Sequence, residues 1–188
     1  MTRDDQRSDE QLVAAANDGD PAAFDALYLR YRDWVLRLAW RFTHDREESL
    51  DVLQETFLYL LHRFPGFELT ARMTTFLYPV VRSIAVTHHR KRARQADSDA
   101  YHIDDYLHDQ PEKADPEPLR LSSRQLDALL SPLSDDQREI ILMRFVDDMT
   151  PSEIAQALNI PAGTAKSRLH GAIRRLHDDP ETRRYFEQ

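Results

Sequence analysis

Apolar side chains recur at spacings of three and four along most of this chain, the period of an amphipathic helix. Ser8 and Gln11 have the spacing of a capping box ahead of an apolar run, so a first helix is predicted from Ser8. Asp20 and Pro21 predict a second start, as a cap followed by proline in the first turn. The long stripe behind them consists of Phe24, Leu27, Tyr28, Tyr31, Val35, Leu38 and Phe42.

Two more apolar stripes complete this part of the chain. The third predicted helix is expected to end at Pro65, and its stripe comprises Leu50, Leu53, Phe57, Leu60, Leu61 and Phe64. The fourth runs from Thr75 to Arg94. We expect Pro79 to kink this helix or restart it near Leu77, because proline removes a backbone hydrogen bond. Residues 8–94 are thus predicted to form one helical domain.

A linker is predicted at residues 95–119. This segment holds eight acidic side chains, three prolines and no sustained period. Such a segment buries too little apolar surface to offset the conformational entropy that it loses on ordering.

A second helical domain is predicted at residues 120–178. Thr150 and Glu153 have capping-box spacing, and they begin a short helix to Leu158, a three-residue turn and a longer helix through Leu176. The expected core of these two helices is Ile154, Ala155, Leu158, Ile160, Ala165, Leu169 and Ile173.

The composition supports an all-α fold. Only 4 of the 188 residues are glycine and 31% are charged, which disfavours turn-rich β architectures. The absence of cysteine excludes disulfides and thiol chemistry, and the 8 histidines show no metal-ligand spacing. No apolar run approaches the roughly 18 residues of a membrane helix, and no signal-peptide core is present. We expect a cytoplasmic protein of two small helical domains joined by an acidic flexible linker, with no metal, cofactor or small-molecule substrate.

The net charge of −8 conceals two basic segments. Residues 82–94 contain five basic side chains and no acid, and residues 161–177 contain Lys166, Arg168, Arg174 and Arg175. Such local asymmetry favours two nucleic-acid contacts. The alternative for the first segment is a basic helix end that complements the helix dipole.

The short helix, tight turn and basic second helix form a helix-turn-helix pattern. The outward face of the second helix is predicted to present Thr164, Lys166, Ser167, Arg168 and His170. These side-chain types contact phosphates, and Arg and Lys also pair with guanine edges in the major groove. An ordinary helical hairpin with a solvated basic face is the alternative.

In the first domain, Asp51, Gln54 and Glu55 lie on the polar side of the stripe through Leu53 and Phe57. By itself this pattern fits a solvated helix face equally well. The sequence has no glycine-rich phosphate loop, nucleophile–base pair or metal cluster, so no enzymatic activity is expected.

Three motifs in this order resemble the extracytoplasmic-function (ECF) sigma factors, minimal two-domain members of the sigma-70 family of bacterial RNA polymerase. Residues 51–57, DVLQETF, are similar to the family's D-L-V-Q-E-T-F signature. Residues 75–92 contain TFLY, RSIA and HHRKR, which resemble its promoter-melting helix. Residues 160–170, IPAGTAKSRLH, closely resemble I-P-x-G-T-V-K-S-R-L-H in its second domain. The chain departs from the usual tryptophan, arginine, asparagine and aspartate of the melting helix at Phe76, Pro79, Ser83 and Thr87.

The resemblance implies a transcription initiation factor that binds core RNA polymerase, directs it to promoters and assists promoter melting. Residues 8–94 would correspond to sigma-70 region 2 and residues 120–178 to region 4. Core polymerase contacts are implied for Asp51, Gln54, Glu55 and Phe57. Contacts to the minus-ten element are implied for Thr75, Phe76, Arg82, Ser83, His88, Arg90, Lys91 and Arg92. Contacts to the minus-thirty-five element are implied for Gly163, Thr164, Lys166, Ser167, Arg168, His170 and Arg174.

Two further features come with the resemblance. In this family the loop that corresponds to Pro65–Met73 helps to choose the flipped promoter base. An anti-sigma factor that covers both domains is a usual partner, in addition to polymerase and promoter DNA.

Two other classes of protein remain open. A stand-alone helix-turn-helix regulator would need a dimer interface or an effector pocket in residues 8–94, and would bind its operator without polymerase. A sigma mimic that titrates an anti-sigma factor usually adds a receiver domain, whose alternating strands and helices this pattern lacks. The motif at residues 51–57 and the basic recognition helix favour the sigma factor.

Overall fold

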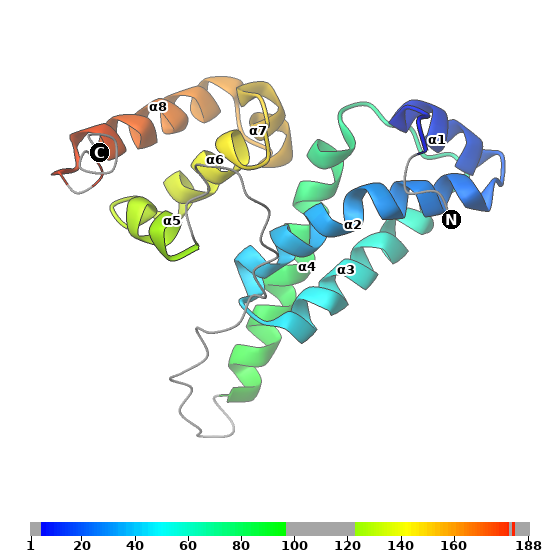
Figure 1. The fold of residues 1–188 in the computed structure, drawn as a ribbon, viewed down its shortest axis with the longest axis horizontal. Coiled ribbons are helices and arrows are strands. Elements are labelled where there is room, and N and C mark those ends of the chain that lie inside the picture. Colours follow the sequence, from blue (N-terminus) through cyan, green and yellow to red (C-terminus); the bar gives the residue numbers. More distant parts are fainter. Residues whose placement is uncertain (1–4, 97–122, 181, 183–188) are drawn as a thin grey trace, which may run out of the picture. The chain divides into compact units, whose positions relative to one another are not determined.

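A computed structural model describes residues 5–96, 123–180 and 182 of the chain. All regular secondary structure in these ranges is α-helical, as Figure 1 shows, which confirms the predicted all-α fold. The chain divides into two compact units, Met1–Ala100 and Tyr101–Gln188. The predicted linker at 95–119 lies almost wholly outside the described residues. None of the described helices has both the length and the apolar character needed to cross a membrane.

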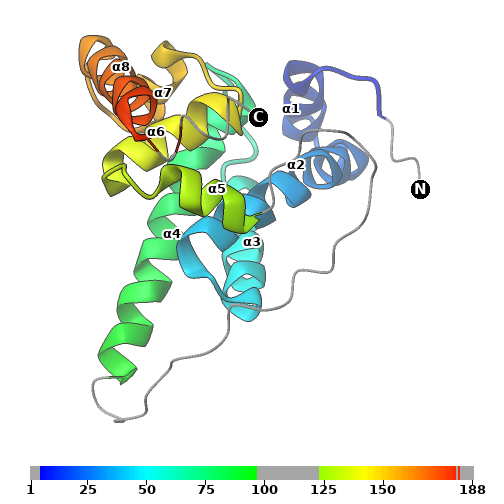
Figure 2. The same cartoon turned by 60° about the vertical axis from the view of Figure 1, so that its left-hand side comes forward.

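The described part of unit 1 consists of α1 (Asp9–Asn17), α2 (Pro21–Thr43), α3 (Arg46–Leu61) and α4 (Met73–Ala96). Helix α2 packs against each of the other three, and α3 also packs against α4 (Figure 2). The fully buried side chains at their centre include Leu12, Leu27, Leu38, Leu60, Met73, Leu77 and Tyr78. This core holds α3 and α4 against each other and leaves one face of each helix to solvent.

The helix starts of unit 1 follow their caps. Ser8 begins α1 with a capping box and Asp20 caps α2, both as predicted. Asp45 caps α3, where its Oδ1 accepts hydrogen bonds from the backbone N–H groups of Glu47 at 2.9 Å and Glu48 at 3.0 Å. A carboxylate at this position also complements the positive end of the helix dipole.

Several predictions for unit 1 are wrong in detail. Helix α3 ends at Leu61, so Phe64 lies in the following loop. Leu50 and Leu61, two members of the predicted apolar stripe, are 39% and 46% exposed, because the stripe is wider than the face that α3 packs. Helix α4 continues unbroken through Pro79, and the expected restart near Leu77 does not occur. Pro79 is exposed, while the buried side chains around it hold the helix against the core.

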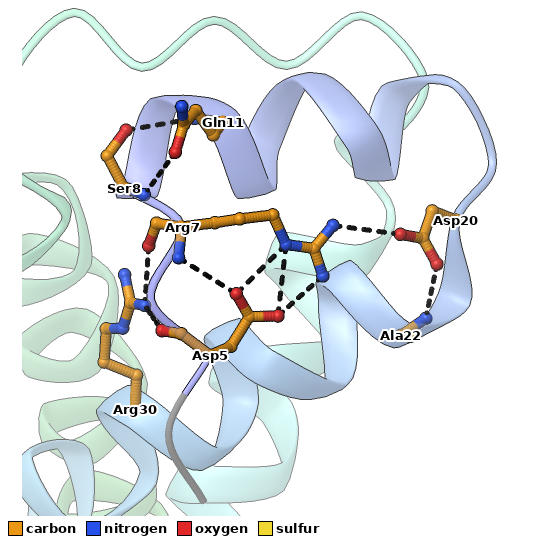
Figure 3. Close-up of polar contacts among 7 residues, drawn as sticks. All are labelled: Asp5, Arg7, Ser8, Gln11, Asp20, Ala22 and Arg30. Atoms are coloured by element: carbon orange, nitrogen blue, oxygen red, sulfur yellow. Dashed lines mark hydrogen bonds and ion pairs between the residues drawn. The ribbon is translucent and has the colours of Figure 1, made fainter. Parts of the chain in front are cut away.

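A network of charged side chains fixes the residues that precede α1 (Figure 3). Arg7 lies between two carboxylates, with Nη2 2.6 Å from Asp5 Oδ2 and Nη1 3.1 Å from Asp20 Oδ2. Hydrogen bonds from Arg7 lower the pKa of Asp5 to about 2. Arg30 on α2 donates to the carbonyl oxygens of Asp5 and Arg7, and its Nη1 lies 2.5 Å from Asp9 Oδ1. The segment before α1 is thereby tied to α2.

The described part of unit 2 consists of α5 (Ser123–Leu130), α6 (Asp135–Phe145), α7 (Pro151–Ala157) and α8 (Ala162–Asp178). Helices α6 and α7 both pack against α8 and against each other. One core cluster contains Leu130, Leu133, Ile141 and Ala172, and further buried side chains are Ile140, Met143, Met149 and Ile154.

The turn between α7 and α8 has the predicted helix-turn-helix form. Thr150 starts α7 with the predicted capping box. Asn159 adopts a left-handed backbone conformation with φ of 52°, and the N–H of Ile160 donates to the carbonyl of Ala155 at 2.9 Å. The buried methyl group of Ala155 leaves room for α8 to pack against α7.

One face of α8 differs from the prediction. Ile173 was expected in the core but is 42% exposed, and Ala172 is fully buried instead. Ala165, Leu169, Ala172 and Leu176 follow spacings of four, three and four, which places them on one side of the helix. Ile173 is turned away from that side.

Candidate functional site

The outward face of α3 presents the three polar residues of the first motif. Asp51, Gln54 and Glu55 are all exposed. Leu58, which the sequence analysis did not single out, is 52% exposed. Together with Leu50 and Leu61 it lies three or four residues from its neighbours along α3, on the same side as Gln54. We call these six residues the α3 face. Exposed apolar side chains that are rimmed by polar groups mark surfaces that bind other proteins.

Phe57, predicted to contact polymerase, does not belong to this face. Its side chain is 5% exposed, and its ring lies edge-on to the ring of Tyr28 on α2 with centroids 4.8 Å apart. The ring fills the core that supports the α3 face, so little of its surface is open to a direct contact with polymerase.

The candidate DNA-binding residues of α4 differ in their exposure. Arg82, Ser83, Arg90, Lys91 and Arg92 are exposed, and Phe76 and His88 are partly exposed. Thr75, in contrast, is 2% exposed, which leaves its side chain little surface for a contact with DNA.

Two of the α4 candidates already hold acidic partners on and beside α3. His88 Nε2 lies 2.8 Å from Glu55 Oε1. Arg92 Nη1 lies 3.0 Å from both Asp45 Oδ2 and Glu48 Oε1. The backbone N–H of Glu48 and then Arg92 lower the pKa of Asp45, and the two carboxylates raise the pKa of Arg92. The basic end of α4 is therefore partly neutralised within unit 1, which the sequence did not indicate.

Tyr59 and Phe76, with Arg63 beside them, lie where α3 ends and α4 begins, and we call them the aromatic platform. The rings of Tyr59 and Phe76 are stacked, with centroids 6.4 Å apart and an interplanar angle of 28°. The guanidinium of Arg63 lies 4.7 Å from the Tyr59 ring centroid. Tyr59 is 37% exposed. Exposed aromatic rings beside arginine are the usual platform on which single-stranded bases stack.

Of this platform the sequence singled out only Phe76. Tyr59 and Arg63 lie four and eight residues after Glu55 of the DVLQETF motif, and that spacing is the signal that could have indicated them. A further residue that sequence reasoning missed is Asn17, whose side chain binds the backbone of the loop between α3 and α4. This loop runs along α1 in Figure 1.

The candidate recognition helix of unit 2 is α8. Gly163, Lys166, Ser167, Arg168, His170 and Arg174 are exposed, and Thr164 is partly exposed. Arg168 Nη1 lies 3.3 Å from Asp136 Oδ2 on α6. Ser167 Oγ donates to the Thr164 carbonyl at 3.0 Å. The predicted face is thus open to solvent, with one of its cations held by an acid from a neighbouring helix.

Comparison with known proteins agrees with this arrangement. The family model for Sigma-70 region 2 matches residues 27–95, and the model for Sigma-70, region 4 matches residues 123–176. The RNA polymerase sigma-H factor of Pseudomonas aeruginosa is 31% identical over 175 residues, which cover 89% of this chain and 91% of that protein. The ECF RNA polymerase sigma factor SigW of Bacillus subtilis is 26% identical over 180 residues, covering 86% and 90%.

The fold is also found in a solved structure. The sigma factor RpoE of Bartonella quintana, crystallised in complex with the anti-sigma factor NepR, matches with a TM-score of 0.64 and 23% sequence identity. That match covers 82% of this chain and 94% of RpoE. With both sigma-70 regions in order and a relative of this similarity along nearly the whole chain, the chain belongs to the sigma-70 family, as a sigma factor of the extracytoplasmic-function type.

Proposed function

We propose that this initiation factor directs RNA polymerase to promoters through three surfaces, one for polymerase and two for DNA. The observation that carries the proposal is the presence of a region 2 match and a region 4 match on one chain. Residues 8–94 and 120–178 act as the two working domains, and residues 95–119 connect them.

The α3 face binds core polymerase. Asp51 and Glu55 supply negative charge, Gln54 supplies a hydrogen-bonding amide, and the apolar neighbours supply surface that loses water on binding. The support is their common exposure on one side of α3, together with the motif that the family uses for this contact.

The melted minus-ten strand binds where α3, the following loop and α4 meet. Tyr59 and Phe76 offer ring faces to unstacked bases, while Arg82, Arg90 and Lys91 lie exposed on α4, the element whose basic groups attract phosphates. The loop from Pro65 to Met73 helps to select the flipped base. His88 and Arg92 also contact acids on and beside α3, in addition to any phosphate contact.

Helix α8 reads the minus-thirty-five element from the major groove. Its exposed side chains combine one hydroxyl, several cations and an imidazole, which are the groups that contact base edges and phosphates. The amino-terminal part of a recognition helix approaches the bases in this docking mode, and Thr164, Lys166 and Ser167 lie there.

The factor has no chemical reaction of its own and works in the cytoplasm, where polymerase meets the chromosome. The enzyme to which it binds performs the catalysis. An anti-sigma factor regulates it by covering its binding surfaces. The anti-sigma factor bound to RpoE of Bartonella quintana supports this proposal by similarity of fold.

Reconstitution tests the proposed function. The purified chain is mixed with bacterial core polymerase, followed by gel filtration and by transcription from a library of random promoters. Co-elution and initiation at sites that share two spaced elements are expected. Tight DNA binding by the chain alone, without co-elution, would instead identify a stand-alone regulator, and binding to an anti-sigma factor without transcription would identify a sigma mimic.

The contact with polymerase has its own test. Alanine at Asp51, Gln54 and Glu55 together is expected to weaken core binding while helicity is unchanged. Alanine at Asp25 and Asp33, two exposed acids of α2, makes the same change in net charge away from the α3 face and serves as the matched control. Equal core affinity for both variants would show that the assignment of the α3 face is wrong.

A further inference from the structure

One side chain of α1 fastens the loop between α3 and α4. Asn17 Oδ1 accepts hydrogen bonds from the backbone N–H of Gly66 at 2.7 Å and of Phe67 at 3.1 Å. Asn17 Nδ2 donates to the carbonyl of Phe67 at 2.9 Å. One amide therefore satisfies three backbone groups of a segment about 50 residues away, in a loop whose own backbone forms no helix. Asn17 also precedes residue 27, where the match to region 2 begins.

The backbone of Gly66 is shaped for this contact. Its φ of +100° is a conformation that L side chains rarely adopt, and a Cβ placed on Gly66 would meet no heavy atom within 4 Å. The glycine is therefore required by its backbone conformation rather than by lack of space. That conformation is the one in which the Gly66 N–H reaches Asn17.

The contact extends through Phe67 to the aromatic platform. Phe67 is 7% exposed, and its ring centroid lies 4.7 Å from that of Phe76. Phe76 in turn stacks on Tyr59. On the other side, the ring of Phe64 lies 5.5 Å from that of Phe67. The hydrogen bonds that hold the Phe67 backbone therefore also hold the ring that lies against Phe76 and, through Phe76, supports Tyr59.

We infer that Asn17 is a positioning residue for base recognition in the melted promoter strand. Glu68 and Thr70 follow Phe67 in the loop, and both are exposed. By holding the backbone of Gly66 and Phe67, Asn17 sets the distance from these two side chains to the Tyr59–Phe76 platform. The ligand is an unstacked base of single-stranded DNA, which the rings stack and whose edge those polar groups meet. The inference rests on the proposed function, in which this loop meets the minus-ten strand.

Hydrogen exchange tests whether the contact orders the loop. In the full chain, Asn17→Ala is expected to raise the amide exchange rates of Gly66 and Phe67 about tenfold or more, since both N–H groups lose their acceptor. Gln11→Ala is the matched control, because it removes a capping-box partner from the same helix without touching the loop. Unchanged exchange in Asn17→Ala would overturn the inference.

Base selectivity tests whether this order serves recognition. Holoenzymes carrying each variant transcribe a promoter library with all four bases at every minus-ten position. Asn17→Ala is expected to lower discrimination at one position about fivefold to tenfold, the effect of losing two or three hydrogen bonds that set geometry. Core affinity and discrimination at the minus-thirty-five element are expected to stay at wild-type levels.

Asn17→Asp provides a second variant, in which an oxygen replaces the side-chain NH2 group of asparagine. Its carboxylate still accepts from Gly66 and Phe67, but it places an oxygen against the Phe67 carbonyl, so an intermediate loss of discrimination is expected. Wild-type discrimination in both Asn17 variants, or an equal loss in Gln11→Ala, would overturn the inference alone. No promoter-specific initiation by the wild-type holoenzyme would overturn the proposed function, and the inference with it.

Discussion

The imidazole of His88 on α4 lies 2.8 Å from the carboxylate of Glu55 on α3, so a residue implied to face DNA contacts one implied to face polymerase. The two side chains are 24% and 52% exposed. A pair this open to water contributes little to folding, because solvent screens the charges and both side chains lose freedom. The pair lies between the two proposed binding surfaces, and this position matters more than its contribution to stability.

Alanine at either partner should therefore change the stability of the fold little, whereas only one of the two changes should weaken polymerase binding. His88→Ala is expected to change the free energy of unfolding by less than about 1 kcal/mol and to leave the Kd for core polymerase unchanged. Glu55→Ala is expected to be equally stable but to bind core polymerase more weakly. Urea unfolding and a core-binding titration measure both quantities. A loss of core affinity in His88→Ala as large as that in Glu55→Ala would contradict this assignment.

Phe57 provides a test of the buried part of the polymerase motif. Phe57→Ala leaves a cavity beside Tyr28 and is expected to lower the free energy of unfolding by about 3–5 kcal/mol. Phe57→Leu keeps most of the volume and is expected to bind core polymerase like the wild type under conditions where it is folded. Weak core binding by a fully folded Phe57→Leu would indicate a direct contact after all.

The pKa of Asp45 predicts a response to acid. Because this pKa is lowered in the folded protein, the carboxylate stabilises unit 1 at pH values above its unfolded pKa of about 4. That contribution is lost as the pH falls through the lowered folded value. Asp45→Asn keeps an oxygen to cap α3 but has no charge to lose. From pH 7 to pH 3, the free energy of unfolding is expected to fall less in Asp45→Asn than in the wild type, by a difference of less than about 1 kcal/mol. Urea unfolding at pH 7, 5 and 3 measures both proteins. An equal fall in the two would contradict a role for the Asp45 charge.

Asp136 is predicted to restrain the recognition helix. Asp136→Asn removes the partner of Arg168, so holoenzyme affinity for minus-thirty-five DNA is expected to rise about twofold to threefold at low salt, with the gain fading at high salt. Asp135→Asn makes the same charge change one residue away and is the control. Fluorescence anisotropy with labelled DNA at several salt concentrations gives both affinities. An equal gain in the two variants would mean that net charge alone is responsible.

The features that sequence predicted best are those decided within a few residues. The starts at Ser8, Asp20 and Thr150 were predicted because a cap and its partner lie in the same turn of chain. The family was found in the same way, from short motifs whose residues are consecutive.

The features that sequence missed depend on partners far along the chain. Arg92 and Asp45 are 47 residues apart, and no periodicity indicates that their side chains meet. Motifs also mark residues without saying whether they point outward, which is why Phe57 was taken for a contact although it lies in the core. The choice between Ala172 and Ile173 failed because the packing of α6 and α7 against α8, rather than hydrophobicity, decides which one is buried.

The distance in sequence between Asn17 and its partners also bears on how unit 1 is made. Hydrogen bonds within helices form between near neighbours, but the bonds to Gly66 and Phe67 close a segment of about 50 residues and carry the entropy cost of doing so. We therefore expect this loop to become ordered late in folding and to open early on unfolding. A nascent chain would then acquire the helix proposed to bind polymerase before the loop proposed to select a base, so the ability to bind the enzyme would precede the ability to choose a promoter.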